Sequence, residues 1–335
     1  MAQLAIAILN YNGAEHLKTF LPSLIKYSPE ADIIIGDNAS TDNSVKILEE
    51  EFPSVSIVKM PENRGYAGGY NQLLETINAD YIALVNSDLE VTEGWLKPLT
   101  QVLDDDASVA AVQPKILSYQ NRKFFEYAGA GGGYLDKFGY PYCRGRIFTT
   151  VEEDNGQYDD EAELFWASGA CFLLRKVAFE TVGGFDESFF AHMEEIDLNW
   201  RLHKEGFKIK YTGKSTVYHL GGGTLAYDNP RKTYLNFRNG WIMLLKNLTE
   251  YNRLSVFIKR YMLDLLSIIF FLVQFKAASA IAVLRAHFNV LFSLSTIERP
   301  NRLAIEAKNN YIIKPTNISI VWQYFIRNKK RFSDL

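Results

Sequence analysis

Residues 81–90 read YIALVNSDLE, a short apolar run that stops at a polar Asn-Ser-Asp sequence. A run of this kind predicts a buried strand of a parallel sheet that ends at Asn86. Ligands of open α/β sheets bind beyond the carboxyl ends of the strands. Asp88 is therefore a candidate ligand of a divalent cation, which prefers oxygen donors and bridges substrate phosphates. Alternatively, residues 86–88 only form a turn and cap the next helix.

The chain on both sides of this run alternates between predicted strands and helices. Apolar, β-prone runs occupy residues 4–9, 31–36, 55–59, 109–117, 164–174 and 208–219, the run at 164–174 containing a glycine break. Apolar residues at helical spacing occupy residues 15–26, 42–51, 95–103, 176–182 and 191–204. This alternation predicts an α/β fold with a mostly parallel sheet flanked by helices. Residues 124–160 break the pattern and predict a long loop or a small hairpin insert, a kind of segment that often forms a lid.

The composition fits a folded chain whose two parts differ in charge. The 335 residues are 47% hydrophobic, enough for one large domain with an appendage. The net charge of -3 combines +9 for residues 251–335, which hold 13 Lys/Arg against 4 Asp/Glu, with -12 for residues 1–250. We therefore expect an acidic domain over residues 1–250 and a basic helical extension over residues 251–335. No nucleic-acid partner is expected.

Several features of the sequence favour a cytoplasmic protein. Cys143 and Cys171 are too few for a disulfide framework or a zinc cluster, which indicates a reducing compartment. The N-terminus has an apolar run but neither a cationic leader nor a small-residue cleavage site. No apolar stretch reaches the roughly 20 residues of a spanning helix. The nearest stretch, residues 265–275, stops at Lys276.

A glycine-rich segment, residues 61–71, leads into a predicted helix and includes Gly65, Gly68 and Gly69. Glycines before a helix can present backbone N–H groups and a positive dipole end to a phosphate. The segment matches neither the dinucleotide fingerprint nor the glycine-lysine loop of ATPases. The alternative is that these glycines only permit tight packing.

The predicted helix 191–204 begins with Glu194 and Glu195. Two adjacent carboxylates at a helix start suit a cleft wall, where the helix dipole favours their ionised forms and either could act as a general base. Asp197 and Arg201, four residues apart, predict a surface ion pair of small value. His219 ends the last predicted strand and precedes three glycines, although a lone histidine is more often a core or surface residue.

Seven motifs in sequence order give the chain its resemblance to the family 2 inverting glycosyltransferases of the GT-A fold, particularly their rhamnosyltransferase-like bacterial members. The match covers roughly residues 3–250. The motifs are LNYNG (9–13), GDNASTD (36–42), NRG with AG and Asn71 (63–71), VNSD (85–88), WASGA (166–170), EEID with WR (194–201) and His219.

The resemblance implies a role for each motif. The nucleotide-sugar donor, a UDP-sugar or dTDP-rhamnose, would lie against Asn10, Asp37, Asn63, Gly65, Gly68, Asn71 and Asn86. Asp88 corresponds to the last acid of the family's Asp-x-Asp metal motif and His219 to a further contact with the metal, Mg²⁺ or Mn²⁺, or the diphosphate. Asn86 replaces the first acid of that motif, which implies weaker metal binding. Trp166 and Gly169 would lie on the acceptor side.

The base of the family is the second member of a Glu-Asp pair, which corresponds to Glu195, with Glu194 as a second candidate. The resemblance implies a single displacement in which this base deprotonates an acceptor hydroxyl and the sugar inverts. The acceptor would be a glycan or a lipid-linked sugar of cell-surface polysaccharide synthesis.

Residues 251–335 lie outside the resemblance. Apolar side chains at helical spacing between Phe257 and Leu272 stand beside Lys259 and Arg260, and residues 327–331 add a basic cluster. Basic and apolar faces together suit an anionic membrane surface, so peripheral attachment at the inner face of the cell membrane is our hypothesis. The alternatives are a helical cap on the catalytic domain or a homodimer interface.

Two other functions compete with this interpretation. A sugar-nucleotide pyrophosphorylase would need a Gly-rich, basic loop after the first strand, where this chain has residues 10–15 without a cation. A non-catalytic carbohydrate-binding protein could keep the fold, because Asn86 and Glu195 both depart from the commonest family pattern.

Overall fold

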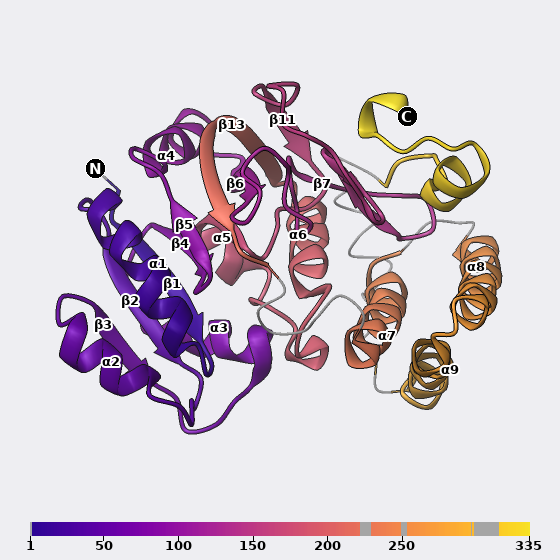
Figure 1. Ribbon diagram of the computed structural model, residues 1–335, viewed down its shortest axis with the longest axis horizontal. Helices are drawn as coiled ribbons and strands as arrows, with labels where there is room; N and C mark the ends of the chain where they lie inside the picture. Colours follow the sequence, from indigo (N-terminus) through magenta and orange to yellow (C-terminus); the bar gives the residue numbers. More distant parts are fainter. Residues whose placement is uncertain (1, 222–228, 249–252, 296, 298–314) are drawn as a thin grey trace.

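The computed structural model describes residues 2–221, 229–248, 253–295, 297 and 315–335. Its centre is a nine-stranded sheet within these residues, in the order β11-β13-β6-β12-β4-β1-β2-β3, with β5 paired to β13 (Figure 1). The strands are β1 (Leu4–Asn10), β2 (Asp32–Asp37), β3 (Ser56–Lys59), β4 (Tyr81–Asn86), β5 (Leu89–Val91), β6 (Val109–Ser118), β11 (Glu161–Leu164), β12 (Cys171–Arg175) and β13 (Lys208–His219).

Parallel and antiparallel pairs divide this sheet. The pairs β3-β2, β2-β1, β1-β4 and β6-β13 are parallel. β12 runs antiparallel to both β4 and β6, and β11 and β5 run antiparallel to β13. The predicted parallel order is thus confirmed from β4 to β3, whereas the other neighbour of β4, β12, is antiparallel. The carboxyl ends of β1, β2 and β4 lie at one edge.

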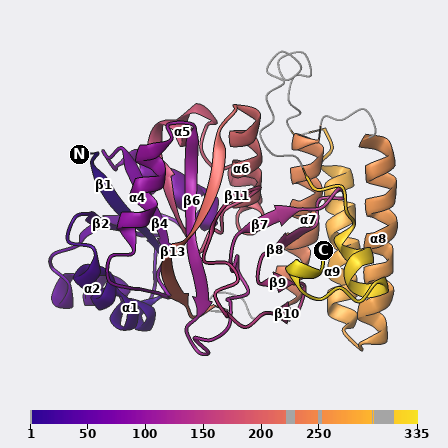
Figure 2. The same cartoon turned by 90° about the horizontal axis from the view of Figure 1, so that it is seen from above.

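Helices cover both faces of the sheet, and α7, α8 and α9 lie together at one end of the molecule (Figure 2). The helices are α1 (Ala14–Tyr27), α2 (Ser44–Glu51), α3 (Gly65–Glu75), α4 (Leu96–Asp105), α5 (Lys176–Thr181), α6 (Glu194–Lys204), α7 (Pro230–Asn247), α8 (Arg253–Val273) and α9 (Ala277–Phe292).

Side-chain alternation along β1 explains the two hydrophobic cores. Ile6 and Ile8 belong to the core under α1 and α4, whereas Ala5 and Ala7 belong to the core under α3 and α6. All four are at most 3% exposed. Because successive strand residues point to opposite faces, one apolar strand can hold helices on both sides.

The strand predicted over residues 164–174 is confirmed only in its second part, because β11 already ends at Leu164, residues 165–170 lie in no strand, and β12 begins at Cys171. β11 pairs with β13 and β12 pairs with β4, so the chain leaves one position in the sheet and returns at another. Between them, the Trp166 N–H donates to the Gly133 carbonyl (3.2 Å), and the Gly133 N–H donates to the Trp166 carbonyl (3.1 Å). The Trp166 ring occupies the space that a Cβ on Gly133 would need.

The insert at 124–160 contains a small antiparallel sheet of β7 (Gly133–Leu135), β8 (Pro141–Cys143), β9 (Arg146–Ile147) and β10 (Thr150–Val151). The hairpin prediction is confirmed, and much of this sheet is buried. Residues 315–335 pack on it, since the Ile320 N–H donates to Asp136 (2.9 Å) and Tyr142 and Ile147 contact Ile320 and Tyr324. The chain end therefore belongs to the same packed unit.

Candidate functional site

The carboxyl end of β4 brings an amide, a carboxylate and an imidazole together. β5 pairs antiparallel with the end of β13 in a register that sets Leu89 opposite His219. That register lies one residue beyond Asp88 and places the Asp88 Oδ1 3.0 Å from the His219 Nε2. The Asn86 amide nitrogen lies 3.4 Å from the same ring nitrogen. The resemblance implied that Asn86, Asp88 and His219 serve one donor and metal site, and the structure brings the three side chains together; their roles stay a prediction.

Glu126, which the sequence interpretation missed, completes this group from the insert. Its Oε2 lies 3.2 Å from the His219 Nδ1, so the imidazole stands between two carboxylates. Burial alone would lower the pKa of His219, but the hydrogen bonds to Asp88 and Glu126 raise it to about 10. Burial would likewise raise the pKa of Asp88, and the hydrogen bond with His219 lowers it instead. The group is therefore a charged, buried triad.

Two predicted nucleotide-binding residues, Asn10 and Asp37, meet at the ends of β1 and β2. Parallel pairing sets them side by side, and the Asn10 amide donates to Asp37 Oδ1 (3.2 Å) and to Ser40 Oγ (3.1 Å). Asn10 is 0% and Asp37 3% exposed. The Asn10 Oδ1 is buried and accepts no hydrogen bond from the described residues. The carboxyl ends of β1 and β2 therefore present polar side chains, among which the Asn10 Oδ1 can still accept a hydrogen bond.

The other residues that were predicted to bind the nucleotide-sugar donor make contacts within the protein. Asn63 Oδ1 accepts from the Gly65 N–H (2.9 Å) and from the Asn38 amide (3.0 Å). Both ends of the Asn71 amide bind the backbone of Phe185 at 2.9 Å. Gly65, at φ 70°, lies against the Phe190 carbonyl, and Gly68 packs on Arg64 and Glu187. The packing alternative therefore accounts for the contacts of these glycines.

Glu195, at the start of α6, approaches the same edge through Gly169 and Ala170, which precede β12. The Asn86 N–H donates to the Ala170 carbonyl (2.9 Å), and a Cβ on the neighbouring Gly169 would stand 3.8 Å from the Glu195 Cβ. Glu195 is thus linked to the carboxyl end of β4 through residues 169 and 170.

Burial decides the protonation of these glutamates. It raises the pKa of Glu195 to about 7 and that of Glu194 well above its ordinary value, with the Glu195 charge as a second cause for Glu194. The backbone N–H groups of α6 lower the pKa of Glu195, as the helix dipole predicts, but burial outweighs them. The Oε2 atom of each glutamate is buried and has no hydrogen-bond partner among the described residues. Burial thus opposes the ionised forms that the helix start was expected to favour, more strongly for Glu194 than for Glu195.

The turn before α6 explains why the helix begins at Glu194 and not at the predicted Ala191. Phe190, His192 and Met193 all take positive φ values, from 61° to 72°, which bulky residues rarely adopt. The side-chain amide of Asn239 on α7 donates to the carbonyls of Phe189 (2.9 Å), Ala191 (2.9 Å) and His192 (2.8 Å). No sequence signal pointed to Asn239, because it follows the turn and the glutamates, residues 189–195, by 44 to 50 residues in the chain.

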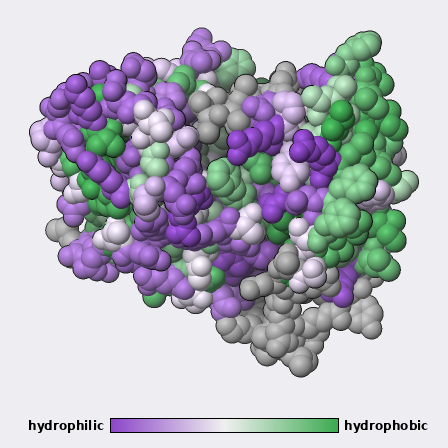
Figure 3. All heavy atoms as spheres, turned by 90° about the horizontal axis from the view of Figure 1, so that it is seen from below, coloured by the Kyte–Doolittle hydropathy of each residue, from purple (hydrophilic) through white to green (hydrophobic). Residues whose placement is uncertain are grey.

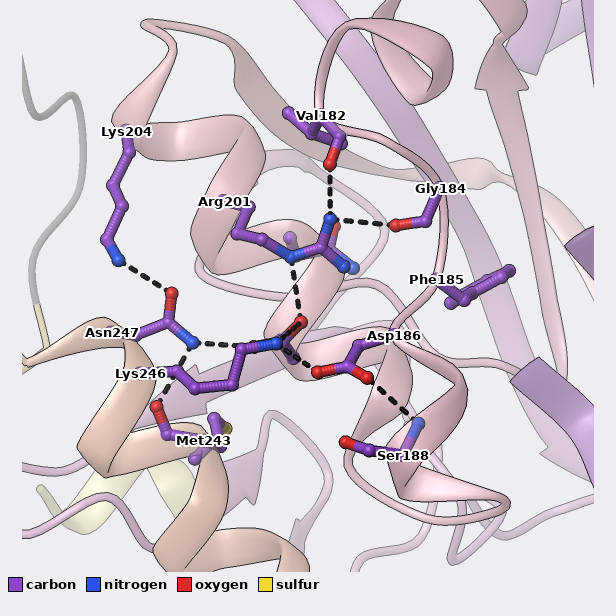
Figure 4. A network of polar contacts seen from close by, with 12 residues as sticks. Val182, Gly184, Phe185, Asp186, Ser188, Arg201, Lys204, Met243, Lys246 and Asn247 are labelled. Atoms are coloured by element: carbon purple, nitrogen blue, oxygen red, sulfur yellow. Dashed lines mark hydrogen bonds and ion pairs between the residues drawn. The ribbon is translucent and has the colours of Figure 1, made fainter. Parts of the chain in front are cut away.

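Asp197 and Arg201 form a buried network, so the predicted surface ion pair is wrong (Figure 4). Asp197 is 0% exposed and accepts from Arg201 (2.8 Å) and from the Asn247 amide (2.6 Å). Arg201 also donates to the carbonyls of Val182 and Gly184, both at 2.7 Å. This network fixes α6 to α7 and to the loop after α5.

Trp166 and Gly169, predicted on the acceptor side, lie in the segment between β11 and β12. Trp166 is 4% exposed and its Nε1 donates to the Tyr134 carbonyl (2.9 Å). The Gly169 carbonyl accepts from the Tyr66 hydroxyl (2.7 Å), which brings α3 next to Glu195. Their contact with an acceptor stays a prediction.

Among the described residues, no three His, Cys, Asp or Glu side chains are arranged to hold a metal ion by themselves. Asp88 and His219 nevertheless offer an oxygen and a nitrogen donor 3.0 Å apart. Such a pair fits an ion that keeps waters and takes its other ligands from substrate phosphates.

Comparisons with known proteins agree with this geometry. The family model described as "Glycosyl transferase family 2" matches residues 5–183. An N-acetylglucosaminyl-diphospho-decaprenol L-rhamnosyltransferase of Mycobacterium tuberculosis is 26% identical over 258 residues, which is 72% of this chain and 83% of the relative.

Two solved structures share the fold. GalNAc-T7 with UDP, GalNAc and Mn²⁺ has a TM-score of 0.56 and 15% identity, over 73% of this chain and 48% of that one. The mannosyltransferase PcManGT from Pyrobaculum calidifontis, with GDP-Man and Mn²⁺, has a TM-score of 0.54 and 12% identity, over 98% of this chain and 88% of that one. At these identities the similarity shows the fold alone.

Proposed function

This chain belongs to glycosyl transferase family 2 and has the GT-A fold, and we propose that it moves a sugar, with inversion, from a nucleoside diphosphate to an acceptor hydroxyl. The observation that carries the proposal is the Glu195 carboxyl, one oxygen of which is buried with no partner among the described residues. Glu195 lies beside Gly169, and the neighbouring Ala170 accepts a hydrogen bond from the Asn86 N–H at the edge that holds the Asp88–His219–Glu126 triad. A single displacement requires a general base and a diphosphate site that face one reacting carbon.

The donor's diphosphate would lie at the edge formed by Asn86, Asp88 and His219, and its nucleoside against Asn10 and Asp37. Asp88 and His219 would hold Mg²⁺ or Mn²⁺, which when bound neutralises charge on the leaving diphosphate. His219, with a pKa of about 10, is charged in the unliganded protein but offsets only one of the two carboxylate charges of Asp88 and Glu126. The cation would therefore supply the positive charge that a diphosphate needs at this edge.

Glu195 would take the proton of the acceptor hydroxyl as the hydroxyl oxygen bonds to the anomeric carbon. The bond from that carbon to the phosphate oxygen breaks on the opposite side, and its electron pair leaves with the nucleoside diphosphate. One displacement of this kind inverts the anomeric carbon. Glu194, whose pKa lies well above its ordinary value, would stay protonated beside the base.

The acceptor we propose is a glycan or lipid-linked sugar of cell-surface polysaccharide synthesis. The support is the mycobacterial relative, whose name describes the transfer of an L-rhamnosyl group to N-acetylglucosaminyl-diphospho-decaprenol. The donor would be dTDP-rhamnose or a UDP-sugar.

Donor turnover with an intact acceptor tests the proposal. The purified chain is incubated with dTDP-rhamnose or UDP-sugars, Mn²⁺ or Mg²⁺, and a polyprenyl-diphosphate sugar, and the product is followed by mass spectrometry and anomeric NMR. We expect a product of inverted configuration that requires the cation. Nucleotide binding without turnover of any donor would favour the non-catalytic alternative, and a retained configuration would exclude Glu195 as the base of a single displacement.

A further inference from the structure

The outer side of α8 and α9 is an exposed hydrophobic surface, which we call the α8/α9 face and define by the exposed large hydrophobic side chains between residues 254 and 292. It includes Val273 at 72%, Phe275 at 96% and Phe292 at 81% exposure. Among the described residues, only Tyr11, Val177 and Phe190 are exposed large hydrophobic side chains before residue 254. Hydrophobic side chains gather at this end of the molecule, while the other end is mostly hydrophilic (Figure 3).

The orientation of α8 is the reverse of that expected for a surface helix in water. Its buried residues are Arg260 and Asp264, whereas Met262, Leu266 and Ile269 are more than half exposed. Asp264 accepts from Tyr140 (2.6 Å) and Trp241 (2.7 Å), and Arg260 donates to the carbonyl of Phe138 (3.0 Å). An ordinary amphipathic helix turns its apolar stripe to the core and its charges to water. The polar contacts therefore hold the apolar side outward.

Positive charge accompanies this face. Lys259 and Arg285 are exposed on α8 and α9, and no Asp or Glu in the described part of residues 253–295 is exposed, since Asp264 is buried. The C-terminal segment adds two exposed arginines, Arg327 and Arg331, against one exposed acid, Asp334. This segment reaches α8 where the ring of Phe325 lies 5.7 Å from that of Phe270. An apolar face with exposed cations suits an anionic interface.

We propose that the α8/α9 face docks on an anionic lipid bilayer, with its hydrophobic side chains in the interfacial layer and its cations among the phosphates. A second copy of the chain is the less suitable occupant, because two such faces would bring like charges together. Within the described residues no helix has both the length and the hydropathy needed to cross a bilayer. In the docking that we propose, α8 and α9 lie along the surface of the bilayer.

α7 connects this face to the candidate base. It packs on α9 on one side, and on the other its Asn239 holds the turn before Glu194. A bilayer at the α8/α9 face would thus present a lipid-linked sugar from a fixed direction. This consequence rests on the proposed function, whereas the docking itself does not.

Vesicle flotation of the full chain tests the docking. We expect the protein to float with phosphatidylglycerol-containing vesicles and much less with phosphatidylcholine alone. In Lys259→Glu with Arg285→Glu, partitioning should fall by about fivefold or more for each charge changed. Ile269→Ser with Phe288→Ser should also reduce it, because both side chains are more than half exposed.

Val177→Ser is the matched control, since Val177 is 61% exposed on α5, and it should float like the parent protein. Absence of flotation with anionic vesicles, or an equal loss in the control, would overturn the docking. Light scattering that shows a dimer, made monomeric by the Ile269 and Phe288 changes, together with no flotation, would assign the face to a second copy. Turnover with a water-soluble acceptor should persist in these variants, so its loss throughout would count against the proposed function and not against the docking.

Discussion

Glu195 combines a buried oxygen without a partner and a pKa raised to about 7 by burial. Glu195→Gln keeps the shape of the side chain but cannot take a proton. We expect turnover to fall by about 10²–10⁴-fold, with nucleotide affinity unchanged in calorimetry. The exposed Glu30→Gln change is the control. A larger loss in Glu194→Gln than in Glu195→Gln would make Glu194 the base.

The pH dependence of turnover should follow from the same group. A base works only when deprotonated, so with a pKa of about 7 for Glu195 the value of kcat/KM should rise with pH up to about 7 and level off above it. An ordinary glutamate would give a plateau already above pH 5 or so. A rate that is flat between pH 5 and 8 would contradict this assignment.

His219 links pH to the free energy of unfolding. Its pKa in the folded chain is about 10, above the ordinary value of 6.5, because of Asp88 and Glu126. The stabilisation from its positive charge is therefore complete below pH 6.5 and is lost as pH rises toward 10. Urea denaturation at pH 6 and pH 9 should show a larger loss for the parent protein than for His219→Gln. Equal losses would mean that His219 is not charged between its two carboxylates.

At the scale of elements, α6 begins where it does because α7 supports the turn before it. Asn239→Ala removes the donor to three backbone carbonyls, one buried and two partly buried, and should cost about 1–3 kcal/mol in urea denaturation. Because the turn orients Glu195, kcat should fall more than the affinity for the nucleotide. The exposed Asn121→Ala change is the control. A variant with lower stability and unchanged kcat would reduce Asn239 to a purely structural role.

At the scale of the whole molecule, Asp264 attaches α8 to the rest of the chain. It is 0% exposed, accepts hydrogen bonds from Tyr140 and Trp241, and forms an ion pair with Arg260. Asp264→Asn leaves the buried Arg260 without a countercharge, so we expect a loss of about 3–5 kcal/mol in denaturation. Asp32→Asn, at an exposed position, is the control. An effect below 1 kcal/mol would show that the buried pair does not anchor α8.

Local sequence patterns were sufficient to predict the parallel part of the sheet and the residues at its carboxyl edge. Apolar strand runs ending in polar residues predicted the sheet and placed Asn10, Asp37 and Asn86 at one edge, because parallel strands align their carboxyl ends. The same reasoning found Asp88, and the end of the last strand gave His219. These features depend on local pattern and on the general geometry of sheets.

Tertiary structure alone decided the contacts between distant segments. Glu126 and Asn239 reach the site from an irregular insert and from a late helix, so no local pattern marks them. The direction of the Glu195 pKa shift and the burial of Asp197 also required the packed molecule, since desolvation depends on every neighbour. The same holds for α8, whose apolar positions predict a helix but not which side faces water. Its buried Arg260 and Asp264 decide that, because a buried charge must lie where its partners are.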